Sequence, residues 1–153
     1  MPKTPSSSSA PGAALIQRYG RDAVPPVGPW NETIERLLAH RSVRAYRSDP
    51  VPAGTLETLI AAAQSASTSS NLQTWSVVAV TDPTTKAELS EIALNQRYVV
   101  ECPLFLVWIA DLSRNDRLGT ATGVPLAGNA YLEMLLMAGI DAALAAQNAT
   151  VAA

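Results

Sequence analysis

The segment His40–Arg47 (HRSVRAYR) carries three arginines and the single histidine of the chain within eight positions. From residue 32 onward there are 12 acidic and 8 basic side chains, so this positive cluster lies in an otherwise acidic region. Guanidinium groups, together with the hydroxyl of Ser42, are suited to bind a phosphate or a carboxylate. The same bases could instead complement the C-terminal dipole of a helix, and the charge pattern leaves both interpretations open.

Two further polar segments are candidate ligand-binding loops. Ser67–Gln73 (STSSNLQ) places hydroxyl and amide side chains between an apolar helical pattern and an apolar strand pattern, where ligand-contacting groups are common. Asn95–Tyr98 (NQRY) occupies a similar place before a second apolar run. Either segment could equally be a capping turn. Two amides, Gln147 and Asn148, interrupt an apolar helical pattern and need buried partners, from a ligand or from a neighbouring helix.

Composition excludes several kinds of site. With one cysteine, Cys102, and one histidine, His40, the chain has neither a disulfide framework nor a metal site built from several such ligands, and we expect no metal. A catalytic triad would have to use His40 as its base. Cys102 begins an apolar run and is expected to be a core residue. The formal net charge of −2 argues against a nucleic-acid partner.

Apolar spacing and capping residues predict that helices and strands alternate along the chain. Asn31 is a suitable N-cap for a helix that begins at Glu32 and ends around residues 40–42. Short β-branched, apolar runs predict strands over 75–81 and 104–110. The other expected elements are a helix from Thr55, a loop over 66–71, a helix over 84–94, an irregular segment over 111–122 and a long helix over 126–153.

One ordered domain, residues 30–153, is expected behind a mobile Pro/Ser-rich extension, residues 1–29, which holds six of the 11 prolines. No signal-peptide pattern is visible and polar residues interrupt the C-terminal helix, so we expect a cytoplasmic protein without a membrane span. Two strands do not make a stable sheet alone, so we expect a partner subunit or a further stretch of chain to complete it. The apolar helix over 141–153 should be buried and lacks a stop signal, so the chain is expected to be the N-terminal part of a longer protein.

Five segments in chain order resemble the nitroreductase family of flavoproteins. They are HRSVRAY, DPVP, SASTSSNLQTWSVVAV, NQRYVVECPLFLVWIADLSR and AAQNATVAA. The resemblance runs from about Glu32 to Ala153 and is greatest to the NADPH-dependent, oxygen-insensitive nitroreductases and flavin reductases. Thr74, which stands where many members of the wider family have proline, favours this subgroup.

The resemblance implies an α+β fold with a central, mainly antiparallel sheet flanked by helices, incomplete in this chain. It also implies an intertwined homodimer with FMN at the subunit interface. The residues matching cofactor-binding positions are His40, Arg41, Ser42 and Arg44 for the phosphate and ribityl chain, Thr68 and Ser70 in a loop that reaches the flavin from this or the partner subunit, and Gln96 at the flavin ring.

The implied activity is transfer of a hydride from NADPH, via FMN, to nitroaromatics, quinones or free flavin in ping-pong order. It needs no catalytic side chain, because the cofactor carries the redox chemistry. The implied partners are small-molecule electron acceptors and a second subunit. Two alternatives stay open: a truncated, non-catalytic fragment unable to retain FMN, and a relative that cleaves its own flavin instead of reducing substrates.

Overall fold

The computed structural model describes residues 10–21 and 26–153, which fall into two compact units, Met1–Val43 and Arg44–Ala153. The described residues of the first unit form the helices α1 (Ala10–Tyr19) and α2 (Glu32–Ala39). The second unit contains α3 (Thr55–Gln64), β1 (Trp75–Val80), α4 (Pro83–Ile92), α5 (Arg97–Glu101), β2 (Phe105–Ala110), α6 (Ser113–Thr122) and α7 (Leu132–Ala152), with short 3₁₀ turns at Ser69–Asn71 and Ala127–Ala130.

In the first unit, helix α2 begins and ends where the sequence predicts. The Asn31 side chain accepts a hydrogen bond from the Ile34 amide at 3.0 Å, which satisfies one of the free N–H groups of the first turn. The helix ends at Ala39, with His40 as its C-cap in an extended conformation. Part of the predicted extension over 1–29 is the helix α1, whereas residues 1–9 and 22–25 lie outside the described residues.

In the second unit, the two predicted strands form an antiparallel pair. β1 and β2 pair from Trp75 opposite Ala110 to Val80 opposite Phe105. Because side chains alternate along a strand, Trp75 and Val77 lie on one face, with Trp108 and Leu106 of β2 on the same face. This face carries the core, so the helices and the antiparallel pair together confirm the predicted α+β class.

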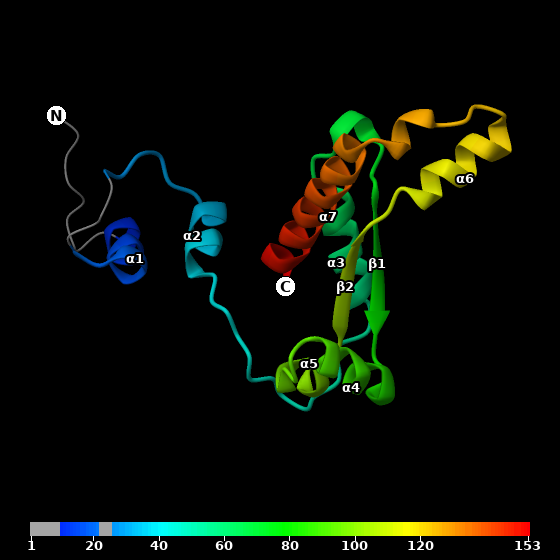
Figure 1. The fold of residues 1–153 in the computed structure, drawn as a ribbon. Helices are drawn as coiled ribbons and strands as arrows, with labels where there is room; N and C mark the ends of the chain where they lie inside the picture. The colour runs from blue at the N-terminus through cyan, green and yellow to red at the C-terminus, as the bar shows by residue number, and fades with distance from the viewer. Residues whose placement is uncertain (1–9, 22–25) are drawn as a thin grey trace. The chain divides into compact units, whose positions relative to one another are not determined.

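The core forms where α7 packs against α3 and both strands (Figure 1). Small side chains line the buried side of α7, which lets its backbone approach its neighbours closely. The rings of Trp75 and Trp108 lie 5.4 Å apart at 47°, a favourable tilted arrangement. The buried cluster consists of Leu59, Ala63, Trp75, Ala142, Ala145 and Ala149.

Segment 111–122, predicted to be irregular, is instead mostly the helix α6, so that prediction is wrong. The N-cap position is Leu112, and Asp111 just before it accepts hydrogen bonds through its carboxylate from the amide of Ser113, the first residue of the helix, at 2.9 Å and from the Ser113 hydroxyl at 2.6 Å. The helix ends at Gly123, which has a left-handed φ of 72°. Gly119 allows the close return of the chain, because a Cβ there would lie 2.6 Å from the Val124 carbonyl oxygen.

Helix α7 is less buried than the sequence predicts. Within the segment 141–153, which was expected to be buried, Leu144 is 41% exposed and Gln147 is exposed as well; Leu135, Leu136 and Ile140, earlier in the helix, are 55%, 59% and 59% exposed. By length and composition alone this helix is long and apolar enough to cross a membrane, a criterion that the core helices of soluble proteins also meet. In the second unit it is the core helix, with one face packed and the other open.

Candidate functional site

The basic cluster begins at the end of α2, in the first unit. Arg41 folds back on this helix: its Nη1 donates to the carbonyl oxygens of Leu38 at 3.2 Å and His40 at 2.8 Å. Arg18 also donates to the His40 carbonyl, at 2.8 Å. Arg41 therefore complements the C-terminal end of a helix, which is one of the two roles that its sequence context allowed. His40, Arg41 and Ser42 are all exposed.

Arg44, in the second unit, lies beside α5. Its guanidinium carbon is 6.0 Å from the centroid of the Tyr98 ring, at the outer limit of a cation–π contact. Tyr98 is only two residues from Gln96, so the structure brings two of the predicted site residues, Arg44 and Gln96, to the same part of the unit.

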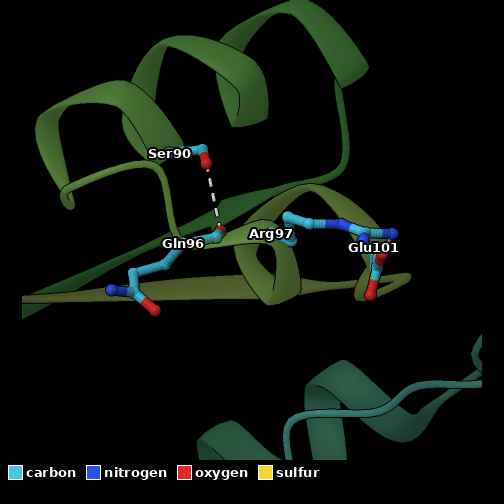
Figure 2. Close-up of polar contacts among 4 residues, drawn as sticks. All are labelled: Ser90, Gln96, Arg97 and Glu101. Atoms are coloured by element: carbon cyan, nitrogen blue, oxygen red, sulfur yellow. Dashed lines mark hydrogen bonds and ion pairs between the residues drawn. The ribbon is translucent and has the colours of Figure 1, made fainter.

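Gln96 follows a tight turn that its neighbours hold in place. Leu94 and Asn95 both have left-handed φ values, 59° and 58°, which non-glycine residues adopt at a cost in free energy. The Asn95 amide donates to the Ser90 carbonyl at 2.8 Å, and the Ser90 hydroxyl donates to the Gln96 carbonyl at 3.0 Å. Figure 2 shows that the Gln96 side-chain amide points away from Ser90 and away from the neighbouring Arg97–Glu101 ion pair. The turn thus leaves this amide available to a ligand.

A buried lysine, Lys86, holds the C-terminal end of α5, the helix that follows Gln96. Lys86 of α4 donates from Nζ to the carbonyl oxygens of Val100 at 3.0 Å and Cys102 at 2.7 Å, close to the C-terminal end of α5. Cys102 is buried, as expected of a core residue, and burial raises the pKa of its thiol. A thiol that stays protonated is a poor nucleophile, so the structure gives Cys102 a packing role.

Thr68 and Ser70 lie at the other end of the strand pair. They belong to the loop before β1, whereas Gln96 precedes α5 and the start of β2, at the Val80–Phe105 end (Figure 1). A strand of six residues is about 20 Å long, so these two groups of candidate residues are well separated within one chain. The Thr68 hydroxyl oxygen is buried and has no hydrogen-bond partner in the described part of the chain.

The loop from Thr68 to Thr74 is fixed from α7 and from α6. Asp141 of α7 accepts hydrogen bonds from the backbone amides of Ser69 and Thr74, at 3.1 and 3.2 Å. From α6, the Asn115 amide donates to the Leu72 carbonyl at 3.2 Å, and Arg114 donates to the Gln73 carbonyl. A pocket of about 520 Å³ lies between this loop and α6.

Asn148, which the sequence left between a ligand and a neighbouring helix, binds the helix. Its Nδ2 donates to the Ala62 carbonyl at 3.2 Å and lies 3.4 Å from the Ser65 hydroxyl, so it ties α7 to the end of α3. Gln147, expected to be buried, is exposed.

Three residues that shape this site were not singled out by the sequence: Ser90, Lys86 and Asp141. For Asp141 a signal existed, because a single carboxylate in an apolar helical run must find buried donors. Ser90 and Lys86 lie in a polar helix, where nothing in the sequence distinguishes them from exposed residues.

Residues 37–153 match the pattern of the nitroreductase family. The chain belongs to this family. It is 44% identical over 124 residues to an FMN reductase (NADPH) of Bacillus subtilis, covering 80% of this chain and 50% of that protein. An NADPH-flavin oxidoreductase of Vibrio harveyi is 39% identical over 123 residues, with coverages of 80% and 49%.

The fold of this nitroreductase-family chain is also that of solved relatives. The structure of the NfrA1 nitroreductase from B. subtilis superposes with a TM-score of 0.76 at 43% identity, over 79% of this chain and 49% of that one. The chain thus spans about half the length of the relatives that it matches.

Proposed function

We propose that the intact protein is an FMN-dependent oxidoreductase that takes a hydride from NADPH and delivers it to nitroaromatics, quinones or free flavin. The observation that carries this proposal is the similarity to an FMN reductase (NADPH) and an NADPH-flavin oxidoreductase over 80% of this chain. The cofactors FMN and NADPH, the acceptors and the order of the steps are part of the proposal.

The donor set fits the phosphate of FMN. Arg44 is exposed and keeps its guanidinium beside Tyr98, and the two helix contacts of Arg41 use only Nη1 of a group that carries five N–H donors. Planar guanidinium groups bind phosphate oxygens in pairs of charge-assisted hydrogen bonds. His40 and Ser42 would add a donor each. We assign the phosphate and ribityl chain to these four residues.

The other donors fit the ring of a flavin. The Gln96 amide can both donate to and accept from the polar edge of the ring, and its turn is fixed by Ser90 (Figure 2). At the loop before β1, Ser70 is exposed, and the buried Thr68 hydroxyl still needs a partner.

The separation of these two groups supports a shared site between two copies. Because Gln96 and the Thr68–Ser70 loop lie at opposite ends of the strand pair, they contact one cofactor most directly if each comes from a different subunit. The open face of α7, with Leu135, Leu136 and Ile140, offers the apolar surface that such a dimer would bury. A homodimer is therefore part of the proposal.

Bound FMN would supply the two-electron chemistry, accepting the hydride and passing it on. The chain's own residues bind and orient: the arginines neutralise the phosphate, and Gln96 and Ser70 set the ring's position and polarity. No proton transfer by a side chain is required. In the proposed order of steps, NADPH and the acceptor would bind in turn, so the residues around bound FMN would have to leave the flavin accessible to both.

The experiment is a titration of the purified, flavin-free intact protein with FMN, followed by flavin fluorescence. Saturable binding at one FMN per subunit supports the proposal, and a dimer that dissociates when Leu136→Glu is introduced supports the shared site. A protein that binds no FMN would instead support the alternative of a non-catalytic chain.

A further inference from the structure

The loop between α3 and β1 is strained. Ser70, Asn71 and Gln73 have φ values of 52°, 53° and 50°, so three of four consecutive residues are left-handed, and none is glycine. Such conformations persist only where the surroundings impose them. Something outside the loop must therefore hold Thr68–Thr74 in this shape.

Asp141 joins the two ends of this loop. Its Oδ1 accepts from the Ser69 amide at 3.1 Å, and its Oδ2 accepts from the Thr74 amide at 3.2 Å and the Thr74 hydroxyl at 3.1 Å. One carboxylate thus fixes both ends of the strained segment. The contacts made by Asn115 and Arg114 reach only carbonyl oxygens in its middle.

The environment of Asp141 shows why a carboxylate is needed there. The residue is 2% exposed, and Thr74 is 1% exposed. Within the described residues its hydrogen-bond partners are all neutral, and no arginine or lysine pairs with it. A carboxylate accepts at both oxygens, whereas an amide must present an NH₂ to one of the two backbone amides.

We propose that Asp141 is a positioning residue for the cofactor site: it holds the loop so that Thr68 and Ser70 face the flavin, without touching the flavin itself. This inference rests on the proposed function. It assigns to the middle of the core helix α7 a role in shaping the cofactor site in addition to its packing role.

The test is Asp141→Asn in the intact protein, with Ala145→Gly as a matched control. Ala145 lies one turn further along α7, is fully buried in the apolar core cluster and has no polar side-chain atom, so its replacement lowers stability without removing a hydrogen bond to the loop. Residue-resolved amide hydrogen exchange and FMN affinity are measured on both variants, together with the reduction potential of the bound flavin.

In Asp141→Asn we expect exchange at the Ser69 or Thr74 amide to rise ten-fold or more while the Val78 amide in β1 stays protected. We expect FMN to bind about ten-fold more weakly and its potential to shift. Ala145→Gly should lower the melting temperature and leave the loop exchange, the FMN affinity and the flavin potential unchanged. Unchanged exchange at both loop amides in Asp141→Asn, or equal losses of FMN affinity in the two variants, would overturn the proposal.

If Asp141→Asn does not fold, Thr74→Val serves in its place, because it removes only the hydroxyl donor. Two- to three-fold changes in loop exchange and FMN affinity support the proposal, and no change in either overturns it. A wild-type protein that binds no FMN would overturn the proposed function and the flavin half of this inference, while the exchange data would still decide whether Asp141 holds the loop.

Discussion

Replacing Arg44 with alanine is expected to weaken FMN binding about ten-fold or more. Arg44 is exposed in the second unit, where its guanidinium lies over the Tyr98 ring, so its donors are available to a phosphate. A hydrogen bond to a charged group contributes about 1.5–3 kcal/mol, and each 1.4 kcal/mol is about a factor of ten in affinity. The Tyr98 contact is worth about 0.5–1 kcal/mol, so Tyr98→Leu should weaken binding only about two- to five-fold.

The assay is FMN titration at two salt concentrations, with Arg47→Ala as the control. Arg47 is three residues further on and carries the same charge, but it is 89% exposed and paired with Asp49 at 2.6 Å. Its loss should change FMN affinity little, because an exposed ion pair contributes little. If Arg44→Ala keeps full FMN affinity, or if Arg47→Ala weakens binding as much, the assignment of the phosphate to Arg44 is refuted.

Three further outcomes are expected. Gln96→Ala should retain FMN but change its reduction potential or the turnover, because a neutral hydrogen bond to the ring contributes little to FMN affinity but alters the electronic properties of the flavin. A lowered melting temperature alone would contradict this. The hydroxyls of Ser113 and Ser76 lower the pKa of Asp111 from 3.8 to about 2, so the ionised form is stabilised by folding. That contribution is present above pH 4 and is lost as the pH falls towards 2; in acid-unfolding curves, Asp111→Asn should remove it, and an identical pH dependence would contradict the assignment. Residues 1–153 expressed alone should be colourless and self-associate through the open face of α7, and a soluble yellow monomer in size-exclusion chromatography would argue against this.

The elements that could be predicted from the sequence are those determined by local residues. Asn31 caps α2 through its own side chain, and the β-branched run of β1 forms a strand at the predicted residues. Asp82 caps α4, accepting from the Thr85 amide at 2.7 Å, next to Pro83 in the first turn. Each of these signals acts within three or four residues.

The features that escaped prediction depend on contacts distant in sequence or on weak local signals. The strained loop is held by Asp141, about 70 residues away, and no local pattern reveals that three non-glycine residues are left-handed there. Helix α6 looked irregular because it is polar, although Gly123 marked its end. The separation of Gln96 from Thr68 follows from the pairing of β1 with β2, which the periodicity of either strand alone does not give.

The central claim, that this nitroreductase-family protein uses NADPH to reduce bound FMN, is tested most directly by anaerobic titration of the FMN-loaded intact protein with NADPH. We expect one NADPH per subunit to bleach the visible flavin absorbance and a nitroaromatic or quinone added afterwards to restore it. A protein whose flavin absorbance is unchanged by excess NADPH, or which takes up no FMN at all, would show that the proposed function is wrong.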